Sequence, residues 1–382
     1  MQSYTKVSKE YVELGVPLEK SLYDKNGLLL IKAGGTIDSE RHLSILFEKE
    51  IFCFGEGDED SWLTPQIDDK RNNNEAFVAM DNAKTKLKHV FDHFRAGKAQ
   101  EEFLPRVKAI AISLQEACEL DKDAALANLH LDHGTPYAVI HHLQAATLCE
   151  IVGKRLGVND AARLKLVKAA LTHDIDLLDI QHVLDVYTLP LSHQHSERVR
   201  NHPKASAAIL RELGVTDMNW LDAVEHHHER LDGSGYGDGL SGEAIKIPTR
   251  ILAIADIYSA MIRDRPNRKA IISKEALRKL MLEFGGKSDV RLTHILIKEV
   301  GVFPPGAIVP LANDEIAVVK EQADNSAFPV VYAFIDSSGA AVPTPEKRYT
   351  VDPGNKINSV VPFANYRDSI NTIRSVWTSV PA

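Results

Sequence analysis

Apolar residues recur at helical spacing from about residue 75 to residue 291, and this pattern predicts a mainly helical segment. Asp160 is expected to cap one of the helices. Pro203 and Pro248 are expected between helices or in their first turns, where proline is tolerated. The predicted helices span about residues 76–94, 104–120, 137–156, 160–172, 202–213, 220–231, 249–261 and 273–284.

The N-terminal segment has a different pattern. Short apolar runs on either side of Asn26-Gly27 predict a strand, a turn and a strand over residues 23–31. A short helix from Ser39 to Leu46 and a further strand over residues 50–54 are expected to follow. The polar, acidic stretch 58–74 predicts a linker.

The chain changes again after about residue 301, where prolines interrupt short β-rich runs. The clearest strands are residues 316–319 and 330–335, and a turn is expected at 336–339. The predicted fold class is therefore multidomain, with a small mixed α/β N-terminal domain (1–75), a mainly α central helical domain (76–300) and a β-rich C-terminal extension (301–382).

Composition and charge narrow the possible functions. The 382 residues carry a formal net charge of −8 and no basic block, so binding to long nucleic acid is not expected. The three cysteines lack metal-finger spacing and are too few for a disulfide framework, which fits a reducing compartment. The sequence shows neither a signal core nor a run of about 18 apolar residues, so we expect a cytoplasmic protein without a membrane segment.

Histidines are concentrated in the helical segment. Twelve of the sixteen lie between His130 and His228, so any metal chemistry is expected there. Three consecutive imidazoles, His226, His227 and His228, fall at a predicted helix end and precede a loop that contains four glycines between residues 233 and 239. Imidazoles are metal ligands, and glycines allow a backbone to approach a bound molecule closely. The alternative is a histidine-rich helix end on a solvated loop.

Two further positions point to metal binding. His173 and Asp174 follow the helix predicted over residues 160–172, where both side chains can converge on one ion. Asp256 lies inside a strongly apolar helix, and a buried carboxylate must be neutralised by a proton, a cation or a metal. A salt bridge to a neighbouring arginine is the alternative for Asp256.

His141 and His202, on two other helices, complete a set of five histidines and two aspartates. Imidazole and carboxylate ligands without thiolates suit Fe, Mn, Zn or Ni better than Ca or Mg. Because six or seven ligands are too many for one tetrahedral site, we expect two metal ions bridged by Asp174.

From about Ala125 to Ala307 the chain resembles the HD-GYP family, a bacterial branch of the HD hydrolase superfamily that cleaves cyclic di-GMP. Its motif elements are His141, His173-Asp174, His202-Pro203, the stretch from His227-His228-Glu229 to Gly235-Tyr236, Asp256, and Arg265-Pro266 with Arg268. The resemblance implies that two divalent transition metals, Fe by preference with Mn, Zn or Ni as alternatives, bind His141, His173, Asp174, His202, His227, His228 and Asp256.

The resemblance also implies a substrate and a chemistry. Cyclic di-GMP or a related small phosphoester would be hydrolysed, to linear pGpG or GMP, with His173 and Asp174 as the catalytic pair. Arg265 and Arg268 would hold phosphate oxygens, unless they form structural salt bridges. Asp232 and Tyr236 would contact the substrate or shape the loop, and packing of the loop alone is the alternative.

This sequence departs from the family pattern at three places. The usual His-Asp-Ile-Gly-Lys is His173-Asp-Ile-Asp-Leu177, so a lysine that would contact a substrate phosphate is replaced by Leu177, and Asp176 adds a negative charge. The proline of the Gly-Tyr-Pro motif is Gly237. Tyr137 and Ser259 stand where some members carry carboxylates for a third metal, which favours two.

These departures leave alternatives open. The protein would be a weak or inactive receptor that binds a cyclic dinucleotide, or an HD protein with another chemistry, either an oxygenase or a hydrolase of a different phosphoester. Protein partners would bind through the terminal domains or through the Gly235-Tyr236-Gly237 loop.

Overall fold

The structure is a computed structural model, which describes residues 75–97, 100–181, 192–263, 270–284, 286–323 and 327–378, together with separate positions between residues 5 and 53. The chain divides into two compact units, residues 1–67 and 68–382. Among the described residues, no helix combines the length and the apolar character needed to cross a membrane.

The N-terminal unit contains a four-stranded sheet in the order β1-β4-β2-β3, and its neighbouring strands are antiparallel. The strands are β1 (Thr5–Lys6), β2 (Leu22–Asp24), β3 (Leu29–Ile31) and β4 (Ile51–Cys53). The pairing of β2 with β3 and the position of β4 agree with the predicted strands. The Asn26-Gly27 turn and the linker 58–74 lie outside the described residues, as does most of the helix predicted from Ser39 to Leu46.

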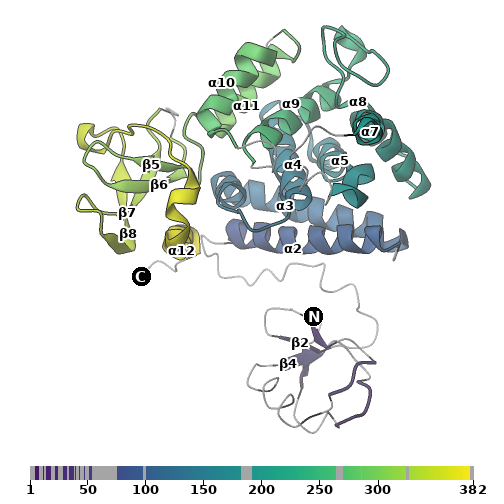
Figure 1. The fold of residues 1–382 in the computed structure, drawn as a ribbon, viewed down its shortest axis with the longest axis horizontal. Helices are drawn as coiled ribbons and strands as arrows, with labels where there is room; N and C mark the ends of the chain where they lie inside the picture. Colours follow the sequence, from purple (N-terminus) through teal and green to yellow (C-terminus); the bar gives the residue numbers. More distant parts are fainter. Residues whose placement is uncertain are drawn as a thin grey trace. The chain divides into compact units, whose positions relative to one another are not determined.

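The second unit is built mainly from helices around one core (Figure 1). The helices are α2 (Glu75–Arg95), α3 (Gln100–His130), α4 (Tyr137–Arg155), α5 (Asp160–Ala170), α7 (His193–Glu212), α8 (Met218–His226), α9 (Ile247–Met261), α10 (Ser273–Phe284) and α11 (Val290–Val300). Helix α4 is buried on every side from Val139 to Gly153, because α3, α5, α9 and α11 pack around it. The central element of the unit is thus a helix that carries one of the predicted ligands, His141.

Several helix ends differ from the prediction for identifiable reasons. The helix expected to end at residue 120 continues to His130 across a kink at Asp121, whose backbone is extended (φ −158°, ψ 94°). The Asp121 carboxylate accepts a hydrogen bond from the Ala124 amide at 2.9 Å and so caps the second segment. Asn159, not Asp160, caps α5, because its side chain accepts from the Ala162 amide at 2.9 Å. Helix α11 was not predicted.

The prediction that Pro203 lies in the first turn of a helix is wrong. Helix α7 begins at His193, where the Ser192 side chain accepts a hydrogen bond from the His195 amide, so Pro203 and His202 lie in its interior. Helix α8 ends at His226 and not at residue 231, which leaves His227 and His228 in a turn.

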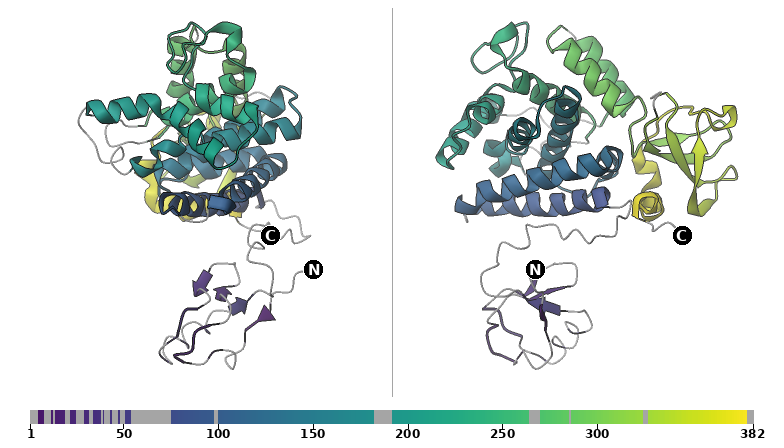
Figure 2. Two further views of the ribbon diagram at one scale, coloured as in Figure 1. Left: turned by 90° about the vertical axis from the view of Figure 1, so that its right-hand side faces the viewer. Right: turned by 180° about the vertical axis from the view of Figure 1, so that it is seen from behind.

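The C-terminal segment forms an antiparallel sheet in the order β5-β6-β7-β8 at one end of the helices (Figures 1 and 2). Its strands are β5 (Ile308–Pro310), β6 (Ile316–Glu321), β7 (Val330–Ile335) and β8 (Ala341–Tyr349). The unpredicted helix α12 (Ile370–Thr378) joins sheet and helices, since it contacts β7, β8 and α2. Its Trp377 is buried and stacks on Phe77 of α2 with ring centroids 5.5 Å apart.

The fold makes a prediction about a buried ion pair. Glu150 of α4 is 1% exposed and accepts from Arg163 of α5 at 2.7 Å. Glu150→Ala removes the buried carboxylate partner of the guanidinium and leaves it the exposed Asp160 and the Val158 carbonyl, so we expect the free energy of unfolding to fall by about 3 kcal/mol. Urea denaturation followed by helical circular dichroism measures this loss.

The matched control is Glu119→Ala, which removes an ion pair to Lys154 on the surface. We expect a loss below about 1 kcal/mol there, because exposed pairs are screened by solvent. Equal losses for the two variants would contradict a structural role for the buried pair.

Candidate metal centre

Seven side chains that are far apart in the sequence meet in the second unit. His141 comes from α4, His202 from α7 and Asp256 from α9. His173 and Asp174 lie in the turn after α5, and His227 and His228 in the turn after α8. They include two groups whose possible ligand atoms all lie within 4.8 Å of one another: His141, His173 and Asp174, and His202, His227 and His228.

Asp174 belongs to the first group and also reaches two imidazoles of the second. Its Oδ1 is 2.8 Å from His202 Nε2 and 3.6 Å from His227 Nε2. Its Oδ2 is 3.6 Å from His173 Nε2 and 3.8 Å from His141 Nε2. Each oxygen thus faces a different pair of imidazoles, which is the arrangement needed for a carboxylate that bridges two cations.

Asp256, on α9, completes the arrangement. Its Oδ1 lies 3.0 Å from His141 Nε2, and its Oδ2 lies 3.9 Å from His228 Nδ1. The side chain is 10% exposed, and the imidazoles of His141, His173 and His228 all lie within ion-pair distance of its carboxylate.

Backbone carbonyls orient three of the imidazoles. His173 Nδ1 lies 2.8 Å from the Ala170 oxygen, and His227 Nδ1 lies 2.7 Å from the Val224 oxygen. Both carbonyls are in the last turn of a helix, where they lack intrahelical partners. If each Nδ1–H donates to its carbonyl, the unprotonated Nε2 faces Asp174, as a metal ligand requires.

His202 obtains the same orientation inside a helix because of Pro203. A residue at position 203 would normally donate its amide to the Val199 carbonyl one turn earlier. Proline has no N–H, so this carbonyl is available, and His202 Nδ1 lies 2.5 Å from it. The His-Pro pair therefore places a candidate ligand in the middle of a helix, whereas the sequence predicted it at a helix start.

The electrostatics of the site favour bound cations. Burial raises the pKa of Asp174 and Asp256, but the surrounding imidazoles outweigh it and hold both pKa values well below the usual range. Burial also opposes charge on His173, yet the two carboxylates raise its pKa to about 9. Burial lowers the pKa of His227 and lowers that of His228 strongly, which keeps both imidazoles neutral.

The donor set fits transition metals. His173 Nε2 is buried and has no hydrogen-bond partner among the described residues, although two carboxylates lie 3.6 and 3.8 Å away. A buried polar atom without a partner is unfavourable, and a shared cation would satisfy it. Five imidazoles with two carboxylates suit Fe, Mn, Zn or Ni.

Two further histidines near the cluster, His226 and His142, lie outside both groups. His226 is half-buried and pairs with Asp222 and Asp238. His142 is 1% exposed, and its Nδ1 lies 2.5 Å from the Ala138 oxygen. Neither one belongs to a group of possible ligand atoms that the structure brings together.

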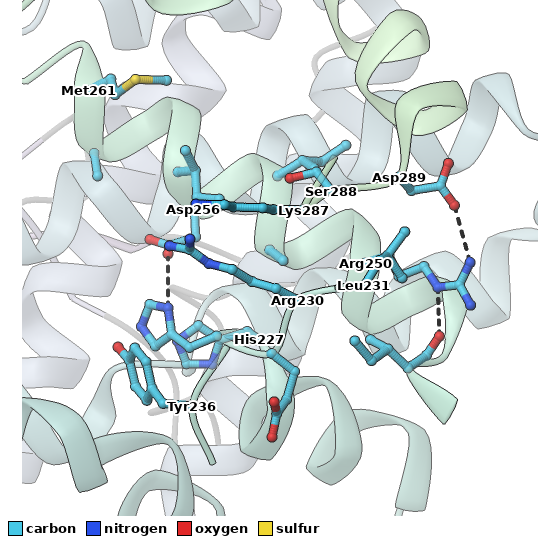
Figure 3. A pocket seen from close by; sticks show the side chains of 17 residues that line it. His227, Arg230, Leu231, Tyr236, Arg250, Asp256, Met261, Lys287, Ser288 and Asp289 are labelled. Atoms are coloured by element: carbon cyan, nitrogen blue, oxygen red, sulfur yellow. Dashed lines mark hydrogen bonds and ion pairs between the residues drawn. The ribbon is translucent and has the colours of Figure 1, made fainter. Parts of the chain in front are cut away.

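A cavity of about 300 Å³ opens beside His227, His228 and Asp256 (Figure 3). Tyr236 lines it and stacks on His228 with ring centroids 4.7 Å apart. Arg230 also lines it and reaches toward Asp256 in Figure 3. The cavity therefore borders three of the candidate metal ligands directly.

Sequence reasoning missed two cations of this cavity, Arg230 and Lys287. Arg230 stands inside the recognised glycine-loop motif, which was a signal for it. Lys287 comes from the connection between α10 and α11, far away in sequence, and no motif marks it. Arg250 also lines the cavity but pairs with Asp289 at 3.2 Å.

Of the two predicted substrate residues that the structure describes, Tyr236 lines the cavity and Asp232 does not. Asp232 is exposed, and its carboxylate accepts hydrogen bonds from the Ser234 amide and hydroxyl at 2.9 and 2.6 Å, which favours the loop-packing alternative. Arg265 and Arg268 lie outside the described residues.

The departures from the family pattern have structural consequences. Leu177, in place of the lysine, is 7% exposed, and Asp176 is neutralised by Arg198 at 3.2 Å. Gly237 has φ +130°, which proline cannot adopt because its ring fixes φ near −65°. The loop around Tyr236 therefore takes a path that the usual Gly-Tyr-Pro sequence excludes.

Tyr137 and Ser259 occupy the two positions considered for a third metal. Tyr137 stacks on His141 with ring centroids 5.0 Å apart, and Ser259 is fully buried.

Comparisons with known proteins support this description. A family model described as "HD domain" matches residues 109–292. A cyclic di-GMP phosphodiesterase of Pseudomonas aeruginosa is 29% identical over 264 residues, which cover 68% of this chain and 62% of that protein. Cyclic di-GMP phosphodiesterase PdeB of Borreliella burgdorferi is 29% identical over 48% of each chain. The chain thus matches about half to three fifths of the length of these relatives.

A third relative, 3'3'-cGAMP-specific phosphodiesterase 3 of Vibrio cholerae, is 32% identical over 38% of this chain and 32% of its own length. Among solved structures, an HDG"Y"P protein of Bdellovibrio bacteriovorus covers 77% of this chain and 98% of its own, with 16% identity and a TM-score of 0.49.

The helical core and the clustered histidines and aspartates define an HD-domain protein with a candidate metal centre. The motif order and the names of these relatives go further and support the resemblance to the HD-GYP family, to which this chain would be a divergent addition.

The first prediction from the site concerns metal content. His173→Ala removes a buried Nε2 that faces both carboxylates, so we expect the purified protein to lose half or more of its bound transition metal. Elemental analysis measures the loss. His226→Ala is the control, because it removes an imidazole from the same region but outside the cluster, and it should keep the full metal content. If His173→Ala also keeps it, the ligand assignment is wrong.

The second prediction concerns Pro203. Pro203→Ala adds an amide that competes with His202 for the Val199 carbonyl, so we expect metal affinity to fall by about 10-fold or more. The unfolding temperature of the metal-free protein should not fall, because alanine is the better residue in a helix interior. Competition with a chromophoric chelator measures the affinity. Unchanged affinity would show that this carbonyl does not orient the ligand.

Proposed function

We propose that this protein is a metal-dependent phosphodiesterase that hydrolyses cyclic di-GMP to linear pGpG or GMP. The observation that carries the proposal is the position of Asp174 between two imidazole pairs, beside a cavity lined by Tyr236 and cations. The names of the relatives add support, since they describe phosphodiesterases of cyclic di-GMP and of 3'3'-cGAMP.

The proposed metal ligands are His141, His173, Asp174, His202, His227, His228 and Asp256. Two bound transition-metal ions, iron by preference, would neutralise phosphate charge and make water a good nucleophile near neutral pH. The ligand geometry suits two ions because the Asp174 oxygens face different imidazoles.

The protein's own residues would bind and orient the substrate. Tyr236 offers an aromatic face next to His228, on which a guanine base can pack. Arg230 would hold phosphate oxygens by bidentate hydrogen bonds, which a planar guanidinium makes well. We keep Arg265 and Arg268 as further proposed phosphate contacts. His173 and Asp174 would act at the reacting phosphate, because both face the space between the ligands.

A second candidate function is a receptor that binds the cyclic dinucleotide without cleaving it. The observation that favours it is Leu177, which is buried and leaves the loop after Asp174 without the cation that this position would supply. The receptor would use the same site as the phosphodiesterase, so only a measurement of turnover distinguishes the two functions.

The test is to load the protein with Fe(II) or Mn(II) without oxygen, add cyclic di-GMP and follow the products by chromatography. We expect linear dinucleotide or GMP, and a fall of about 100-fold or more in turnover for Asp174→Asn, which keeps the shape but not the bridging charge. Saturable binding without product would support the receptor. Neither binding nor turnover would reject both functions for this nucleotide.

A further inference from the structure

A second pocket shares Tyr236 with the first cavity as a lining residue. It has a volume of about 250 Å³ between α7 and the glycine loop, and its lining residues are Arg200, Asn201, Pro203, Lys204, Gly235, Tyr236, Gly237 and Gly239. Two of its lining residues are next to candidate metal ligands: Pro203 follows His202 in the chain, and Tyr236 stacks on His228.

The cations of this pocket are not equivalent. Lys204 pairs with Asp238 at 2.5 Å, and Arg198, one turn before His202, pairs with Asp176 and Asp179. Arg200 is exposed, lines the pocket, and has no ion pair or hydrogen bond among the described residues. An arginine left without an anion beside a pocket is available for a phosphate.

The shape of the glycine loop keeps the pocket open. A Cβ at Gly235 would lie 2.5 Å from the backbone of Glu229 and Arg230, so the loop packs too closely for any side chain there. Gly237, at φ +130°, adds no side chain to the pocket wall. The loop itself is held by Glu229, which accepts hydrogen bonds from the amides of Asp238 and Gly239.

We infer that this pocket binds the second phosphate of a cyclic dinucleotide and that Arg200 is the residue that holds it. The inference rests on the proposed function, since such a substrate carries two phosphodiesters and only one can lie at the metal ligands. Tyr236 lines both pockets, so the substrate would extend past its ring from one pocket to the other. Leu177 leaves the turn after Asp174 without the cation of the family pattern. Arg200 on α7 would provide a positive charge for the substrate instead.

The experiment compares two substrates in the metal-loaded full chain. Cyclic di-GMP has two phosphates, whereas bis(4-nitrophenyl) phosphate has only one and can be cleaved at the metal ligands alone. For Arg200→Ala we expect KM for cyclic di-GMP to rise about 10-fold, with kcat changed less than about two-fold. Turnover of bis(4-nitrophenyl) phosphate should also change less than about two-fold. Arg200→Lys should recover part of the loss, since lysine keeps the charge without the bidentate geometry.

Arg211→Ala is the matched control, because it removes a guanidinium from the same helix at a site that pairs with Glu225 and lies outside the pocket. It should leave both substrates unaffected. The inference is overturned if Arg200→Ala leaves KM for cyclic di-GMP unchanged, or if both substrates lose the same factor. If the wild-type protein neither binds nor cleaves cyclic di-GMP, the proposed function itself fails and this inference with it. Normal wild-type turnover with an unaffected Arg200→Ala variant rejects the inference alone.

Discussion

The structure depends on one unfavourable arrangement, a buried cluster of two carboxylates and five imidazoles. Asp174 and Asp256 keep their charge there only because imidazoles surround them, and at least one nitrogen, His173 Nε2, has no hydrogen-bond partner among the described residues. A cluster of this kind costs free energy unless cations are shared among its members. The packing of the helical unit holds these side chains together and must offset that free-energy cost.

Backbone groups provide much of this support. The carbonyls of Ala170, Val199 and Val224 each orient one imidazole. Two of these carbonyls are free of intrahelical partners because they lie at a helix end, and the third because Pro203 has no amide hydrogen. The fully buried α4 anchors His141 in the centre of the core. The orientation of these imidazoles thus depends on where α5 and α8 end and on the missing amide of Pro203 in α7.

The sequence predicted the helical class, most helices and the candidate ligands, because helical periodicity and the spacing of histidines are local signals. It placed the start of α7 wrongly, since proline is most common in the first turn of a helix, whereas Pro203 lies in the interior and the His202 side chain occupies the Val199 carbonyl. It missed α11 and α12, and it could not single out Lys287 or Arg200. The importance of those two cations depends on which pocket they line, and that is decided by packing between distant segments.

The most direct test is anomalous X-ray diffraction from crystals of the metal-loaded protein. The account predicts two metal peaks, one next to His141 and His173 on the side of Asp174 Oδ2, and one next to His202 and His227 on the side of Asp174 Oδ1. A single peak, or peaks away from Asp174, would contradict a carboxylate that bridges two ions.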